Sequence, residues 1–160
     1  MNPINPIMVY YHCSHRELDK GDIIEPGNWG KMIREAGTKH RSWNREMLLE
    51  EMRVLHFPEK PSRLNSCFCC ISLETMNLYQ KHLCPNGYIY EVEIMDAFAP
   101  FHTGDFNAVE PMPRHHADKY QIAYGYWQYR YKTTIEFEGK AIACTEFLTA
   151  SRLRVLQKLS

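Results

Sequence analysis

The segment "YIYEVEIM", residues 88–95, constrains the fold more than any other part of the sequence. Tyrosine, isoleucine and valine alternate in it with glutamate, and this period of two is typical of a β-strand with one buried face. Pro85, Asn86 and Gly87 stand directly before it and form a strong stop signal. The sequence therefore predicts a strand here, beginning after a turn.

Helical spacing appears in two segments. Apolar residues recur three and four positions apart between Met47 and Leu55, and Pro58 ends this run. Residues 73–83 repeat the pattern, and Ser72 stands in front of them as a candidate N-cap. Within residues 115–132 a further helix is expected to begin near Asp118 and to give way to strand.

Further strands are predicted in the apolar runs at residues 7–14 and 66–72. Two or three more are predicted at residues 133–138, 140–149 and 152–159, with Glu138-Gly139 as a hairpin turn. Residues 18–30 have turn residues on both sides of a very short apolar pair and predict a loop with a brief strand at best, and residues 96–113 predict a long irregular loop. The result is about six strands and two or three helices, with the strands concentrated toward the C-terminus, which indicates an α+β fold. The length favours a single domain over residues 1–160.

Charge and hydropathy exclude several functional classes. The 19 basic residues balance the 19 acidic ones, which implies no general attraction to nucleic acid or to a membrane surface. No uninterrupted apolar window of about 18 residues is present, so no membrane span is expected. The first eight residues contain no basic side chain and predict no secretory signal. We therefore expect a cytoplasmic protein.

The six cysteines indicate reduced thiols in such a compartment. Cys67, Cys69 and Cys70 cluster near Cys84, but the spacing of the first two is tighter than in a zinc knuckle and no second pair follows. We expect no metal site, and we expect the clustered thiols to pack in the core of a strand.

The run "YYHCSHRELDKGDIIEPG", residues 10–27, places His12, Cys13 and Ser14 at the end of the first strand. It resembles the corresponding run of the ADP-ribosyltransferase fold, in the branch of the diphtheria-toxin-like and the small bacterial, rifamycin-inactivating enzymes. The segments "CFCCISLETM", "GYIYEVEIMDAFAPF" and "EFLTASRLRVL" resemble further motifs of that family. The resemblance implies an ADP-ribosyltransferase-like split β-sheet core. It also implies transfer of ADP-ribose from NAD to a protein, nucleic acid or small molecule, as in a bacterial toxin or effector.

The resemblance also implies roles for individual residues. His12 would hydrogen-bond the ribose next to nicotinamide, and the Cys13 backbone would pair with the nicotinamide carboxamide. Ser14 would support the second ribose or the turn. Phe68 would stack on the nicotinamide ring, and Glu146 would stabilise the oxocarbenium-like transition state.

Other positions complete the predicted site or depart from the family pattern. Tyr79 is a candidate second ring, and Ser72 supplies a hydroxyl at the start of its helix. The loop after the third motif offers Asp105 as the alternative carboxylate, ahead of Asp96, although we favour Glu146 because a strand positions a group more rigidly than a loop. Cys13 replaces a usual glycine and is expected to narrow the pocket, whereas Phe68 replaces a tyrosine and lacks its hydroxyl.

Two alternatives stay open on this evidence. An RNA 2′-phosphotransferase on the same fold would also use NAD but would need an arginine-rich phosphate pocket, for which Arg152 and Arg154 are the candidates. A non-catalytic binding module would retain the fold and is favoured by Cys13 and Phe68. The aromatic run at residues 123–132 offers a stacking surface for single-stranded nucleic acid, although core packing of its tyrosines is the favoured interpretation.

Overall fold

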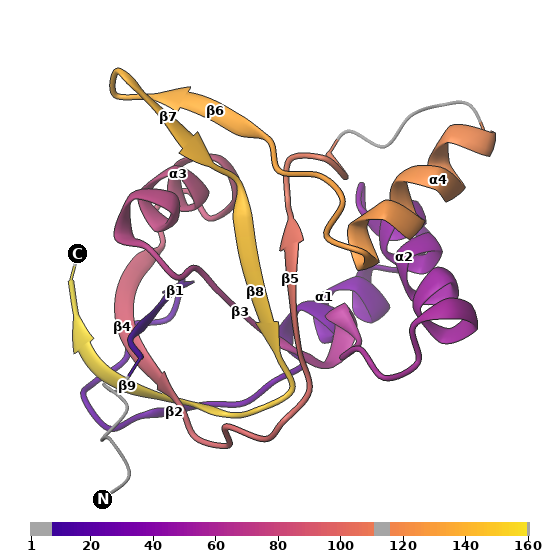
Figure 1. Cartoon of the computed structure of the whole chain (residues 1–160). Coiled ribbons are helices and arrows are strands. Elements are labelled where there is room, and N and C mark those ends of the chain that lie inside the picture. The colour runs from indigo at the N-terminus through magenta and orange to yellow at the C-terminus, as the bar shows by residue number, and fades with distance from the viewer. Residues whose placement is uncertain (1–7, 111–115, 160) are drawn as a thin grey trace, which may run out of the picture.

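The computed structural model describes residues 8–110 and 116–159, and it confirms the α+β class (Figure 1). Residues 1–7, within the segment for which no secretory signal is predicted, lie outside the described residues. The described strands are β1 (Tyr10–Ser14), β2 (Ile23–Ile24), β3 (Cys67–Cys69), β4 (Tyr88–Ile94), β5 (Phe101–Asp105), β6 (Thr134–Phe137), β7 (Lys140–Ala143), β8 (Thr145–Thr149) and β9 (Leu153–Lys158). The helices are α1 (Asn28–Ala36), α2 (Trp43–His56), α3 (Leu73–Leu83) and α4 (His116–Trp127), with short 3-10 helices at Gly37–Lys39 and Arg63–Asn65.

Most of the strands belong to two antiparallel sheets. Sheet A has the order β1-β4-β9-β2, sheet B has the order β3-β8-β5, and β6 and β7 form a separate hairpin. The sheets meet where Tyr11 and Cys70 form an isolated bridge, with backbone hydrogen bonds of 2.9 Å in both directions. The strand that carries His12 therefore lies beside the strand that carries Phe68.

Strand β8 separates two hydrophobic clusters because successive side chains of a strand point to opposite faces. Phe147 packs toward sheet A, with its ring centroid 5.0 Å from that of Tyr10. Leu148 points the other way and packs in a cluster with residues of α2 and α4. Glu146 shares the face of Leu148, so its carboxylate is directed toward the helices.

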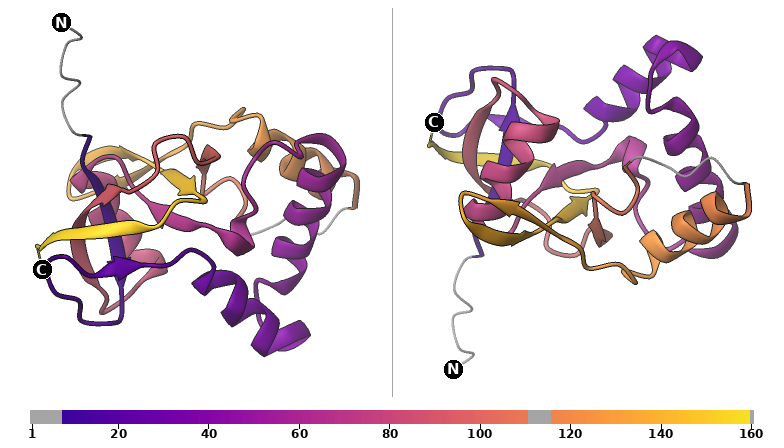
Figure 2. Two further views of the ribbon diagram at one scale, coloured as in Figure 1. Left: turned by 90° about the horizontal axis from the view of Figure 1, so that it is seen from below. Right: turned by 90° about the horizontal axis from the view of Figure 1, so that it is seen from above.

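Three of the four described α-helices form a third layer beside sheet B (Figure 1). Helices α1, α2 and α4 gather on the side of sheet B that faces away from sheet A, as Figures 1 and 2 show. Helix α3 instead packs against β1 and β7. None of the helices in the described part of the chain combines the length and the apolar composition that a bilayer span requires.

The loop predicted for residues 18–30 contains the expected brief strand, β2, but it is wrong in its last part, where α1 begins at Asn28. Gly30 lies inside this helix, and a Cβ added there would overlap the backbone of Leu64. The glycine therefore permits close packing of α1 on the 3-10 helix at Arg63–Asn65, whereas the local sequence suggests a turn. The described residues form four α-helices, so the predicted two or three was too low.

The loop predicted for residues 96–113 is also wrong in part, because β5 runs through it and pairs with β8 along its whole length. The sequence "FHTGD" lacks alternation, and its conformation follows from pairing with a neighbouring strand. Gly104 lies against the ring of Tyr126, which a Cβ at this position would overlap. Residues 111–113 of the predicted loop lie outside the described residues.

Several local predictions are confirmed. The Ser72 hydroxyl caps α3 by accepting a hydrogen bond of 3.2 Å from the Thr75 amide. Glu138 and Gly139 adopt φ values of 51° and 79° in the turn between β6 and β7. The single strand expected at residues 140–149 is divided into β7 and β8 at Cys144, and these strands belong to different sheets.

Candidate functional site

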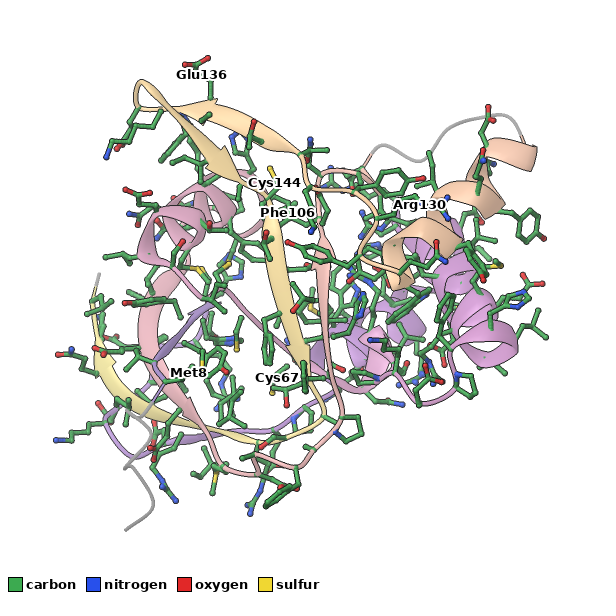
Figure 3. The ribbon with its side chains drawn as sticks, in the orientation of Figure 1. Met8, Cys67, Phe106, Arg130, Glu136 and Cys144 are labelled. Atoms are coloured by element: carbon green, nitrogen blue, oxygen red, sulfur yellow. The ribbon has the colours of Figure 1, made fainter. Side chains whose placement is uncertain are left out.

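A cavity of about 240 Å³ lies where sheet B, α3 and the helical layer meet. Three of the predicted site residues line it, namely Phe68 from β3, Tyr79 from α3 and Glu146 from β8. The other lining residues include Trp29, Arg41, Arg45, Arg63, Leu83 and Phe106. Figure 3 shows Phe106 close to Cys144, just before β8, where the Phe106 amide donates a 2.9 Å hydrogen bond to the Cys144 carbonyl.

Aromatic rings form two walls of this cavity. The guanidinium carbon of Arg63 lies 5.1 Å from the centroid of the Phe68 ring, a cation–π distance. The Tyr79 ring meets Phe106 edge to face at 5.5 Å. Burial raises the pKa of the Tyr79 hydroxyl well above its usual value, and the charge of Glu146 raises it further, so the phenol stays neutral.

The Glu146 carboxylate is buried, and its two oxygens have different surroundings. Oε1 accepts hydrogen bonds from the Arg63 Nη1 group and from the Tyr126 hydroxyl, the latter at 2.7 Å. Oε2 has no hydrogen-bond partner among the described residues, although it is not one of their fully enclosed polar atoms. Since Glu146 lines the cavity, Oε2 is the oxygen that a bound molecule would meet.

Arg63 is shared between two buried carboxylates. Its Nε and Nη2 groups donate to the two oxygens of Glu46 at 2.9 and 3.1 Å, while Nη1 faces Glu146. Burial alone would lower the pKa of Arg63, but the charges of Glu146 and Glu46 outweigh it and raise the pKa well above its usual value. Burial would raise the pKa of Glu46, and the Arg63 charge brings it below the usual value. Arg63 and Glu46 are therefore both ionised near neutral pH.

Two donors beside this network are buried and have no hydrogen-bond acceptor among the described residues, Trp29 Nε1 and Arg45 Nε. The indole of Trp29 lies near enough to help lower the pKa of Glu46, but it makes no hydrogen bond of normal geometry. Arg45 uses its other nitrogens to pair with Glu46 and Glu110. Since buried donors are normally satisfied, a ligand acceptor atom would be stabilised here.

His12 lies beside the cavity and does not line it. Its Nδ1 atom is 2.7 Å from the carbonyl oxygen of Phe68. Because a carbonyl only accepts, Nδ1 carries the proton of this bond. Burial lowers the pKa of His12, although the Phe68 carbonyl partly opposes this. A neutral ring with a proton on Nδ1 leaves the lone pair of Nε2 as an acceptor.

The side chain of Cys13 points away from the cavity, and it is not part of the lining that the described residues provide. It packs beside Cys70, Met76 and Ile89, with its sulfur against Cys84. Cys13 therefore does not narrow this cavity, because strand alternation directs its side chain to the other side of β1.

The backbone amide and carbonyl of Cys13 point in a different direction from its side chain. Tyr11 directs its amide and carbonyl toward Cys70, outward from the edge of sheet A. In an antiparallel strand the residue two positions later directs these groups the same way, so the amide and carbonyl of Cys13 also face outward. Ser14 follows, and its hydroxyl accepts a 3.1 Å hydrogen bond from the Arg16 amide, which holds the turn after β1.

Asp105 and Ser72 have local structural contacts. The Asp105 carboxylate accepts hydrogen bonds from the amides of Asn107 and Ala108 at 2.8 and 3.0 Å, and from the amide and hydroxyl of Thr133. These four bonds hold the turn after β5 against the segment before β6. Ser72 caps α3, as described above. Neither residue lines the cavity as the described residues define it.

Sequence reasoning missed most of the ion-pair network. Tyr126 lies in the aromatic run and is buried with Trp127, which agrees with the favoured interpretation that this run packs in the core. Glu46 stands three positions before Leu49 and shares its helix face, and a carboxylate on an apolar face is the signal that could have identified it. Arg63 has no comparable local signal.

The arginines expected to form a phosphate pocket lie elsewhere. Arg152 pairs with Glu25 at 3.8 Å and Arg154 with Glu93 at 2.7 Å, on the exposed side of sheet A. The arginines that line the cavity are Arg41, Arg45 and Arg63. No group of three or more histidine, cysteine or acidic side chains among the described residues is arranged to hold a metal ion.

Comparison with known proteins gives a family but no activity. No curated protein matches the sequence. The model of a family described as a protein of unknown function (DUF2441) matches residues 10–147. Because this match covers most of the chain, the protein belongs to the DUF2441 family.

Proposed function

We propose that the protein is an NAD-dependent ADP-ribosyltransferase in which sheets A and B form the split core of that fold. The observation that carries the proposal is that Phe68, Tyr79 and Glu146, from three separate elements, line one cavity. NAD is the substrate, and the acceptor is a protein, a nucleic acid or a small molecule. A bacterial toxin or effector role is the biological context that fits this activity.

The rings of Phe68 and Tyr79 support this proposal as walls for the nicotinamide ring. Stacking depends on the π face and on apolar area, which Phe68 retains without a hydroxyl. The cavity of about 240 Å³ is smaller than the roughly 300–1,000 Å³ of a site for a drug-sized ligand. It therefore accepts the nicotinamide end of NAD, and the remainder of the dinucleotide lies outside it.

The edge of β1 supplies the polar contacts that this orientation requires. The outward amide and carbonyl of Cys13 match the carboxamide of nicotinamide, which both donates and accepts hydrogen bonds. The Nε2 lone pair of His12 accepts a hydrogen bond from a hydroxyl of the adjacent ribose. Both groups lie on a paired strand, which fixes their directions.

Glu146 performs the electrostatic part of the reaction. When the bond between nicotinamide and ribose C1′ breaks, its electron pair leaves with nicotinamide and positive charge develops on the ribose. The Oε2 atom of Glu146 stabilises this charge, and the attraction is stronger in a buried site than in water. Arg63 and Tyr126 hold Oε1 and orient the carboxylate. Glu46 offsets the charge of Arg63, so Glu146 keeps its attraction for a cation.

Three arginines favour a second candidate. Arg41, Arg45 and Arg63 line the cavity, and guanidinium groups suit phosphate recognition. This composition is what an RNA 2′-phosphotransferase of the same fold would need. We rank it second because Arg45 and Arg63 are already paired with carboxylates.

The test measures NAD binding and nicotinamide release separately. We expect calorimetry to show binding of NAD, and we expect chromatography to show nicotinamide release when bacterial lysate supplies acceptors. Glu146→Gln should retain binding and lose release, whereas Glu74→Gln, at an exposed ion pair, should change neither. Absence of NAD binding by the folded protein would overturn the proposal.

Two further outcomes identify the alternatives. Binding of NAD without nicotinamide release in any lysate indicates the non-catalytic module. Release that requires RNA with a 2′-phosphate, accompanied by loss of that phosphate, indicates the phosphotransferase.

A further inference from the structure

Two thiols meet on the side of β1 that faces away from the cavity. The sulfur atoms of Cys13 and Cys84 lie 2.7 Å apart, with the Cys13 thiol as the donor. Cys13 belongs to β1, whereas Cys84 directly follows α3. The tertiary fold thus brings together two cysteines that are 71 positions apart.

A histidine and a glycine complete the surroundings of this pair. His15 Nε2 lies 4.0 Å from the Cys84 sulfur and 2.9 Å from the carbonyl oxygen of Pro85. Because that carbonyl only accepts, Nε2 carries a proton and presents it near the sulfur. A Cβ added at Gly87 would overlap both sulfur atoms, so this glycine leaves the space in which the thiols meet.

The pair differs chemically from the other four cysteines. Burial raises the pKa of Cys67, Cys69, Cys70 and Cys144, so these thiols stay protonated. The hydrogen bond from Cys13 lowers the pKa of Cys84 to about 7, with a smaller contribution from His15, and the same contact raises the pKa of Cys13. Of the two thiols, Cys84 therefore ionises first, and Cys13 keeps its proton.

We propose that Cys13 and Cys84 form a peroxide-reactive dithiol that closes to a disulfide. The Cys84 thiolate attacks one oxygen of a hydroperoxide, the O–O bond breaks, and Cys84 becomes a sulfenic acid. The other oxygen leaves and takes up a proton as water or an alcohol. The Cys13 sulfur then attacks the Cys84 sulfur, an S–S bond forms and the S–O bond breaks. The Cys13 proton leaves with the hydroxyl group as water, so two thiols supply the two electrons that reduce the peroxide.

Formation of the disulfide would affect the wall of the cavity, because Cys84 lies next to a lining residue. Leu83 lines the cavity and directly precedes Cys84. A disulfide would fix the end of α3 to β1 and with it this part of the cavity wall. The dithiol chemistry itself does not depend on the proposed transferase activity, so each can be tested without the other.

The test treats the reduced full-length protein with hydrogen peroxide and maps its disulfides by mass spectrometry of peptides. We expect a Cys13–Cys84 peptide, together with the loss of two of the six thiols when the denatured protein is titrated. Cys84→Ser should react with peroxide at least tenfold more slowly. Cys13→Ser should accumulate a sulfenic acid on Cys84 that dimedone traps.

Two matched variants address packing and specificity. Gly87→Ala keeps both thiols but displaces them, and it should slow disulfide formation. Cys144→Ser removes a buried thiol outside the pair and should react like the wild-type protein. The proposal is overturned if the folded wild-type protein forms no Cys13–Cys84 disulfide, or if another cysteine is oxidised first.

Discussion

Arg63 and Glu146 form a buried ion pair, with 6% and 2% of their side chains exposed, on the face of sheet B that carries the cavity. A buried pair contributes little net stability, because the attraction mainly offsets the desolvation of both charges. Removal of one partner is nevertheless destabilising, since the other charge stays buried without compensation. Glu146 thus has a structural role in addition to its proposed chemical one, and substitutions can separate the two.

Replacement of Glu146 by alanine should lower the free energy of unfolding by about 3–5 kcal/mol, as for other broken buried pairs. Glu146→Gln should cost less, because its amide oxygen can still accept hydrogen bonds from Arg63 and Tyr126. Urea denaturation at neutral pH measures both changes. Glu74→Gln provides the control, because its pair with Lys140 is exposed and such changes stay within about 0.5 kcal/mol. A Glu146→Ala protein as stable as the wild type would contradict this role of the pair.

The aromatic walls of the cavity should determine the affinity for NAD. Phe68→Leu and Tyr79→Leu should each weaken binding by about 0.5–1.5 kcal/mol, the contribution expected from aromatic stacking. Phe68→Tyr retains the ring and should bind NAD at least as well as the wild-type protein. Calorimetric titration provides the dissociation constants. Phe101→Leu is the matched control, because Phe101 stacks on Phe147 outside this cavity, and an equal loss of affinity there would argue against the assignment.

Substitution of Asp105 should affect stability more than turnover. Asp105→Ala removes a buried carboxylate that accepts four hydrogen bonds, and it leaves the amides of Asn107 and Ala108 without these acceptors. Each unsatisfied buried group costs about 1–3 kcal/mol, so Tm should fall clearly. Nicotinamide release per folded molecule should stay near the wild-type rate. Loss of release in a fully folded Asp105→Ala protein would transfer the catalytic role from Glu146 to Asp105.

Short sequence patterns correctly predicted the elements whose conformation depends on residues adjacent in the sequence. The cap at Ser72 and the turn at Glu138-Gly139 each depend on a few adjacent positions, so the sequence alone identified them. Strand β5 and helix α1 depend on partners elsewhere in the fold. Glycine in these two elements suggests a turn from sequence, but in the structure it allows close contact with Tyr126 and Leu64.

The residues of the candidate site also divide into those that the sequence predicted and those that it did not. His12, Phe68 and Glu146 lie in segments that resemble family motifs, but the ion-pair network around Glu146 has no such motif. Arg63 lies 17 positions from Glu46 and 83 from Glu146, and no periodicity connects residues at such separations. Cys84, the partner of Cys13, is equally remote at 71 positions, so the sequence around Cys13 gave no sign of this contact.

His102 should make stability depend on pH in the acidic range. Its side chain is buried, Nε2 donates a 3.0 Å hydrogen bond to the Tyr126 carbonyl, and burial lowers its pKa to about 4. In the unfolded chain the pKa is about 6.5, so between these values the unfolded state binds the proton and the native state does not. The stabilisation is therefore complete above pH 6.5 and is lost as the pH falls toward 4, at up to about 1.4 kcal/mol per pH unit.

Urea denaturation of wild-type protein and His102→Gln at several pH values isolates this contribution. Glutamine can still donate a hydrogen bond but does not titrate, so the variant should lose less stability between pH 6.5 and 5, by about 2 kcal/mol. His12, whose pKa burial also lowers, adds a further pH dependence to the stability of both proteins. His12 is present in both proteins, so its contribution cancels in the difference. Identical pH profiles for the two proteins would show that His102 is protonated equally in the folded and unfolded states, contrary to its burial against Tyr126.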